Sequence, residues 1–117
     1  MHTDPTDMST SEISIRVEKD ENNVPEDIRW SAGDAGIEDR AAKAMILAMW
    51  DEQDRNTLRM DLWTKEMEVE EMKFFVHQTI LTLADSFERA TGEDKMAATM
   101  RDFCEYYAEK MKLQQGN

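Results

Sequence analysis

Side chains able to do acid–base or metal chemistry are few and widely separated in this 117-residue chain. Its two histidines are His2, at the start, and His77, in a segment with helical periodicity. Neither has a cysteine or a second histidine three or four positions away, as a zinc site on a helix requires. Because catalysis needs convergent groups within hydrogen-bonding distance, we interpret His77 as a helix-boundary residue rather than a catalytic base.

Two clusters of carboxylates have simpler explanations than catalysis. Asp51, Glu52 and Asp54 resemble the start of a calcium loop, but the glycine and the closing glutamate of that motif are missing. Negative charge is favourable where a helix begins, and the second cluster stands at such a place: Glu68, Glu70 and Glu71. The four glycines form no phosphate-binding loop, and the lone Cys104 is best interpreted as a small buried thiol. We therefore expect no enzyme activity, no cofactor and no metal.

The charge of the chain limits its partners. Twenty-six acidic and fourteen basic residues give a net charge of −12, which repels nucleic acid and anionic membranes. No run of residues approaches the ~20 apolar positions that span a membrane, and the first residues lack the pattern of a signal peptide. Together with the single cysteine, which excludes an internal disulfide, these features predict a cytoplasmic protein.

One segment departs from this acidic character. Residues 41–65 hold four acidic and four basic residues, whereas the segments on either side are strongly acidic. The same segment holds two of the three tryptophans. A neutral, aromatic-rich segment between two acidic ones indicates a face that another protein can approach.

Alternating apolar residues predict strands in the first third of the chain. Residues 13–17 alternate apolar and polar side chains, the period of a half-buried strand. Residues 20–23 are typical of a turn, and residues 24–30 form a second extended segment with its apolar side chains on one side. Residues 31–39, which include two glycines, are expected to form a loop.

A β-hairpin is predicted in the centre of the chain. The apolar run of residues 41–50 on its own fits a helix or a strand, because alanine and methionine also favour helices. Residues 58–63 alternate apolar and polar side chains and follow a polar stretch at residues 51–56. Two such segments around a short polar loop favour an antiparallel hairpin.

From Val69 onward the period changes to that of helices. Apolar residues recur every three or four positions as far as Phe87, and Gly92 has the features of a helix C-terminus. A second apolar stripe consists of Met96, Met100, Phe103, Tyr107 and Met111. The connection between the two stripes is so short that it predicts an antiparallel helix pair.

These elements define the fold class as α+β. We predict an antiparallel meander of three to four strands followed by two antiparallel C-terminal helices packed on one face. A single domain is expected over residues 11–113, with a flexible tail at residues 1–10 and a flexible end at residues 114–117.

The hairpin predicts a surface for a protein partner. If Glu52 lies opposite Thr57 across a four-residue loop, one side of the ribbon is wholly apolar and is expected to carry the helices. The reverse side combines two tryptophans with an arginine and an aspartate, which is the composition of a protein–protein hot spot. The predicted partner-binding residues are Ile46, Trp50, Arg59, Asp61 and Trp63.

Other interpretations of this surface stay open. The two tryptophans could instead cap the edge of the core or lie under residues 1–40. A one-residue change in loop length would reverse which side chains of the first hairpin strand face outward. A second candidate surface consists of the adjacent aromatic pairs Phe74-Phe75 and Tyr106-Tyr107. A homodimer could use either surface.

Four stretches of the chain resemble a known protein family. They are ENNVPEDIRWSA at residues 21–32, TLRMDLWT at 57–64, DSFERAT at 85–91 and MAATMRDF at 96–103. The resemblance extends from about Ser11 to Leu113, and the family is that of the gliding motility-associated protein GldC of Bacteroidetes. It implies a cytoplasmic accessory component linked to gliding over surfaces, and it brings no catalytic residues.

Three hypotheses for the function follow. The first is a non-enzymatic adaptor of the gliding or associated secretion apparatus that binds a protein partner. The second is a chaperone that holds unfolded secretory clients, which is an analogy from size and fold. The third is an enzyme or ligand-binding domain, which would need a polar cavity between sheet and helices that includes His77.

Overall fold

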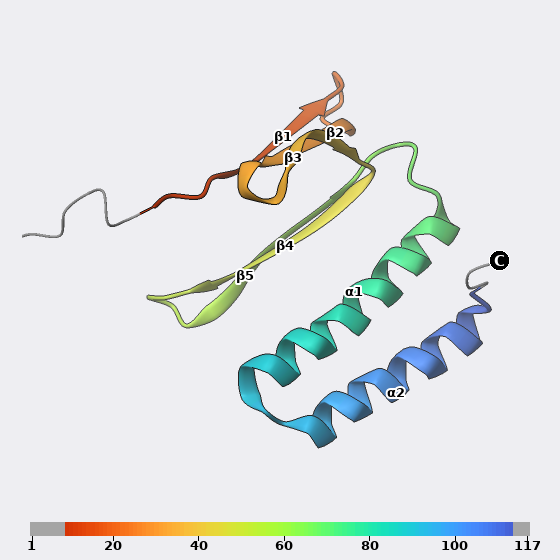
Figure 1. The fold of residues 1–117 in the computed structure, drawn as a ribbon. Helices are drawn as coiled ribbons and strands as arrows, with labels where there is room; N and C mark the ends of the chain where they lie inside the picture. Colours follow the sequence, from red (N-terminus) through yellow and green to blue (C-terminus); the bar gives the residue numbers. More distant parts are fainter. Residues whose placement is uncertain (1–8, 114–117) are drawn as a thin grey trace, which may run out of the picture. The chain divides into compact units, whose positions relative to one another are not determined.

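The computed structural model describes residues 9–113 and confirms the α+β class (Figure 1). Within this range five antiparallel strands come first and two helices follow. The chain divides into two compact units, residues 1–67 with the strands and residues 68–117 with the helices. The single domain and the packing of the helices on the strands stay predictions. The expected flexible ends fall almost wholly outside the described residues.

The first strands form an antiparallel sheet with β2 in the centre: β1 (Ile13–Lys19), β2 (Pro25–Ala32) and β3 (Ile37–Ala42). The register places Ile15 opposite Trp30 and Val17 opposite Ile28, so the apolar side chains share one face. Ile28, in the central strand, is buried and forms the core of this sheet. The alternation in the sequence therefore predicted β1 and β2 correctly.

The expected loop over residues 31–39 is wrong, because most of it is ordered into regular structure. A short 3₁₀ helix, Gly33–Ala35, follows β2 directly, and β3 begins at Ile37. Gly36 makes this tight reversal with a φ of 72°, a conformation that glycine adopts without strain. Residues 38–40 are all charged, so β3 shows no apolar alternation, and its pairing with β2 sets its structure instead.

A long hairpin comes next, built from β4 (Ala44–Asp51) and β5 (Asn56–Trp63). Asp51 closes the turn of this hairpin with two hydrogen bonds. Its backbone carbonyl accepts the N–H of Arg55 over 3.0 Å, and its carboxylate accepts the N–H of Asp54 over 2.7 Å. The acidic cluster that resembles a calcium loop thus orders the four-residue loop of the hairpin.

The base of the hairpin is fastened to the three-stranded sheet. The N–H of Thr64, a buried residue, donates to the carbonyl of Lys43 over 2.8 Å. The Lys65 ammonium then lies 2.7 Å from the carboxylate of Asp20, in the β1–β2 turn. That carboxylate also accepts two backbone N–H groups of its own turn, over 2.8 and 3.0 Å. Lys65 and these N–H groups lower the pKa of Asp20 from 3.8 to about 2.

Replacing Asp20 with asparagine removes the nearer of the two carboxylate charges that bind Lys65, and we expect the variant to unfold at a lower temperature than the wild type at neutral pH. Since the pKa of Asp20 is lowered in the folded state, its contribution is fully present above pH 3.8 and lost as the pH falls through about 2. The difference in melting temperature should therefore shrink across this range. Circular dichroism melts at a series of pH values measure it. Glu21→Gln, at the exposed next position, is the matched control.

The second unit is an antiparallel pair of helices, α1 (Val69–Thr91) and α2 (Asp94–Met111) (Figure 1). The start of α1 confirms the capping role of its acidic cluster, because the N–H of Glu68 donates to the carboxylate of Glu71 over 3.0 Å. Gly92 ends the helix as predicted, with a φ of 74° and its N–H donated to the carbonyl of Glu88 over 2.8 Å.

Small side chains make up the buried part of the helix pair. Ala84 and Ala97 are 0% exposed, and Cys104 is buried as expected. Met96 and Phe103, which the predicted apolar stripe includes, are instead about half exposed. The buried stripe of α2 therefore lies one residue further along than the largest apolar side chains suggest, since small side chains let two helices approach closely.

Charged and hydroxyl groups add specific links between the helices. Arg101 donates to the carboxylates of Asp85 and Glu88 over 2.8 Å each, and these bonds raise its pKa. The hydroxyl of Tyr107 donates to the backbone carbonyl of Lys73 over 3.0 Å. These contacts hold α2 in one alignment along α1.

We expect Ala97→Leu to lower the free energy of unfolding by about 1–3 kcal/mol, because a fully buried position has no room for three more carbon atoms. Ala98→Leu is the matched control, since that neighbouring position is exposed on the same helix. Chemical denaturation followed by circular dichroism measures both. Equal stability of the two variants would contradict this packing of the helix pair.

Candidate functional site

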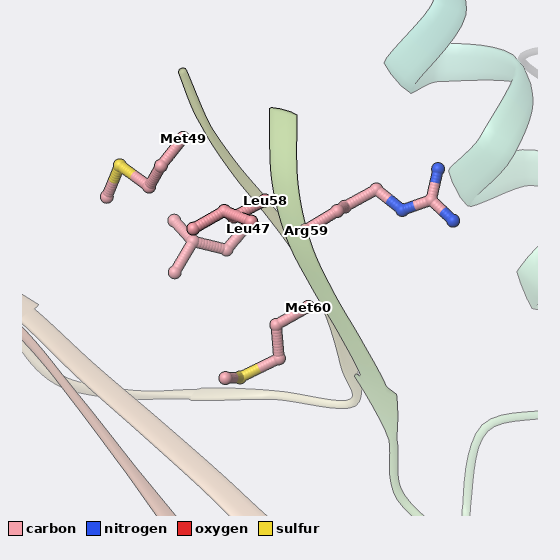
Figure 2. A pocket seen from close by; sticks show the side chains of 5 residues that line it. All are labelled: Leu47, Met49, Leu58, Arg59 and Met60. Atoms are coloured by element: carbon pink, nitrogen blue, oxygen red, sulfur yellow. The ribbon is translucent and has the colours of Figure 1, made fainter. Parts of the chain in front are cut away.

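The β4–β5 ribbon presents two faces of different character, because side chains alternate along each strand. The methionine face consists of Met45, Leu47, Met49, Leu58, Met60 and Leu62. The tryptophan face consists of Ala44, Ile46, Ala48, Trp50, Thr57, Arg59, Asp61 and Trp63. Figure 2 shows this division, with four apolar side chains on one side of the ribbon and that of Arg59 on the other.

The register of the ribbon differs by two residues from the expected one. Asp51 pairs with Asn56, whereas the prediction placed Glu52 opposite Thr57. The loop is four residues long in both cases, but the bonds that Asp51 makes close it one position earlier. An even shift leaves every side chain on its predicted face. The five predicted site residues therefore all lie on the tryptophan face.

Most side chains of the tryptophan face are exposed within the unit of strands. Trp50 is 64% exposed and Trp63 is 54% exposed, so neither is sealed in the core. Arg59 and Asp61 lie between them, exposed, with their charged groups 3.5 Å apart. The face thus has an aromatic side chain towards each end and a neutralised ion pair in the middle.

Trp63 also borders a shallow depression of about 320 Å³. Its other lining residues are Asp61 and Leu62 of β5 and residues 23–25 of the β1–β2 turn. The sequence assigned the turn no binding role. The one signal that marks these turn residues is their place in the first stretch that resembles the family.

The methionine face carries a second, smaller depression of about 170 Å³, lined by Leu47, Met49, Leu58, Arg59 and Met60 (Figure 2). Three of these side chains, Met49, Leu58 and Met60, are more than half exposed. Apolar side chains dominate the lining, so the depression suits another apolar side chain and offers no acid–base pair.

His77 is not the boundary residue that the sequence suggests. It is only 6% exposed, and its ring lies 5.7 Å from that of Tyr107, centroid to centroid. Its Nδ1 has no hydrogen-bond partner. Burial raises the pKa of the Cys104 thiol, the opposite of what an activated nucleophile needs. These side chains pack within the helix pair.

Between residues 9 and 113, no group of three or more His, Cys, Asp or Glu side chains could hold a metal ion. Likewise, neither α1 nor α2 combines the length and the apolar composition that crossing a membrane requires.

The structure places the chain among small α+β proteins that carry an exposed two-stranded β-ribbon. Residues 25–113 match the family described as gliding motility-associated protein GldC-like, and the chain belongs to that family. The resemblance drawn from the sequence is thereby confirmed. Neither a curated protein nor a solved structure matches the chain.

The three tryptophans should differ in their access to solvent. We expect acrylamide to quench Trp50 and Trp63 more strongly than Trp30, which is half-buried in β2. Variants that keep one tryptophan and carry phenylalanine at the other two positions separate the signals. In denaturant the three variants should become equal. Equal quenching in the folded state would contradict the open tryptophan face.

Proposed function

We propose that the protein is a non-enzymatic adaptor of the bacterial gliding motility and associated secretion apparatus. It acts in the cytoplasm by binding another protein through the tryptophan face. The observation that carries this proposal is the exposure of Trp50 and Trp63 on one face of the ribbon. Membership of the GldC-like family supplies the link to gliding motility.

The chemistry of the face suits protein recognition. Tryptophan and arginine are the residue types that most often dominate the binding energy of protein interfaces. Arg59 and Asp61 already neutralise each other at 3.5 Å, which lowers the cost of removing either charge from water. A face with these properties can be buried by a partner without leaving an unpaired charge.

Trp63→Glu should abolish capture of gliding or secretion components while leaving the fold intact. Because Trp63 is more than half exposed, we expect the free energy of unfolding to change by no more than about 0.5–1 kcal/mol. Crosslinked pull-down from a gliding bacterium, with the captured proteins identified by mass spectrometry, measures binding. Leu83→Glu, which alters an exposed apolar residue on α1, is the matched control.

Two outcomes would contradict this proposal. If Trp63→Glu unfolds the protein, Trp63 belongs to the core. If the wild type captures no motility or secretion component after crosslinking, the adaptor function fails.

A chaperone for unfolded secretory clients is the second candidate. The methionine face favours it, because exposed, flexible methionine side chains adapt to varied apolar segments. Suppression of the aggregation of an unfolded secretory protein, lost on Met60→Glu but not on Trp63→Glu, would assign this function instead.

A further inference from the structure

We infer that a second copy of this chain docks on the tryptophan face. The two copies are related by a twofold axis that crosses the ribbon between the Ala48–Arg59 and Ile46–Asp61 pairs. This inference rests on the proposed function, since it takes the tryptophan face as an interaction surface. The second copy and the motility partner exclude each other on that face, so the dimer is the form of the protein that holds no partner.

The cross-strand pairs carry the argument. From the turn to the base of the ribbon they are Trp50–Thr57, Ala48–Arg59, Ile46–Asp61 and Ala44–Trp63. A twofold axis across the ribbon reverses this order in the second copy, so the first pair faces the last and the two middle pairs face each other. Arg59 then lies over Asp61 of the second copy, and Asp61 over its Arg59. The charges of the face are therefore complementary to those of the same face on the second copy.

In the same arrangement, the side-chain sizes of one copy are complementary to those of the other. Trp50 faces Ala44 of the second copy, and Trp63 faces its Thr57. In the middle, Ile46 faces Ala48. Every large apolar side chain of the face meets a small one, as interdigitated sheet packing requires.

The other twofold face-to-face arrangement does not bring opposite charges together. An axis along the ribbon would keep the order of the pairs, so that Arg59 would face Ala48 and Asp61 would face Ile46. Both charges would then be buried against apolar side chains, which is costly. The methionine face would not select one alignment of two copies in this way, because its six residues are all large and uncharged.

The size of the face determines the strength expected of the dimer. Each strand has eight residues, so the ribbon is about 26 Å long and about 10 Å wide. Two such faces bury less than about 1,000 Å² in total, which is the size of weak, reversible interfaces. We therefore expect a dissociation constant in the micromolar range or weaker, on the order of 10–100 μM.

Charge reversal tests the arrangement directly. Sedimentation equilibrium of the full 13.6-kDa chain, from about 10 μM to about 1 mM, spans the affinity expected of such an interface. Arg59→Asp and Asp61→Arg should each raise the dimer dissociation constant by about tenfold or more, because like charges then face each other. An equimolar mixture of the two variants should dimerise again, since each now offers the charge that the other lacks. The double variant Arg59→Asp/Asp61→Arg should also dimerise.

Arg55→Asp, which reverses a charge in the turn outside the tryptophan face, is the control and should leave the dimer unchanged. A wild type that stays monomeric throughout overturns the inference, whether or not another part of the same chain covers the face. The inference is also overturned if the charge reversals leave the dimer dissociation constant unchanged, or if the mixture of the two variants stays monomeric.

These outcomes separate the inference from the proposed function. If the wild type is monomeric and its capture of motility components depends on Trp63, the adaptor function is supported and the dimer is contradicted. A dimer that obeys the charge-reversal pattern but captures no such component leaves the dimer standing and removes the adaptor function.

Discussion

A β-ribbon has only two faces, and successive side chains of β4 and β5 must point to opposite ones. This alternation sorts the ribbon into a uniformly apolar face and a face that mixes tryptophan, small residues and one ion pair. The sorting holds only while the ribbon keeps its register, because a shift of one residue would exchange the faces of one strand. Asp51 fixes the register at the turn, and the Thr64–Lys43 and Lys65–Asp20 bonds fix it at the base.

An isolated two-stranded hairpin is marginally stable in water, so the stability of the ribbon depends on these bonds at its turn and its base. The carboxylate of Asp20 both orders the β1–β2 turn and binds the segment that follows β5. Lys65 therefore links the base of the ribbon to the three-stranded sheet through two carboxylates, since its ammonium also lies 3.3 Å from the carboxylate of Glu26 in β2. The same link brings the turn beside Trp63, where the two segments together form the larger depression. Stability and the shape of the candidate site thus share one cause.

The sequence predicted the ribbon faces, which depend on side-chain alternation, and the ends of α1, which carry recognisable capping residues, but it missed the register of the ribbon and strand β3. The faces of the ribbon followed from alternation, and both ends of α1 followed from Glu68 and Gly92. The exact register did not, because it depends on hydrogen bonds that Asp51 makes within the turn. Strand β3 was missed for a similar reason, since its charged residues carry no apolar pattern.

The helix pair shows a further limit of apolar patterns. A stripe of large residues on α2 suggested a buried face, yet Ala97 and Cys104 occupy the buried positions. Small residues carry little weight in a hydrophobic pattern although they permit the closest approach of two helices. His77 was misjudged by the same reasoning, because its position beside the apolar stripe says nothing about the ring of Tyr107 that it contacts.

Charge explains why association at the ribbon would be selective. The net charge of −12 comes from residues outside 41–65, so two acidic proteins repel each other wherever those segments approach. The neutral ribbon is the part of the chain that escapes this repulsion, and at physiological salt the repulsion decays over about 8 Å. On such a face the tryptophans supply the apolar area, while Arg59 and Asp61 penalise every alignment that leaves them unpaired. Affinity and orientation therefore come from different residues of the same eight-residue surface.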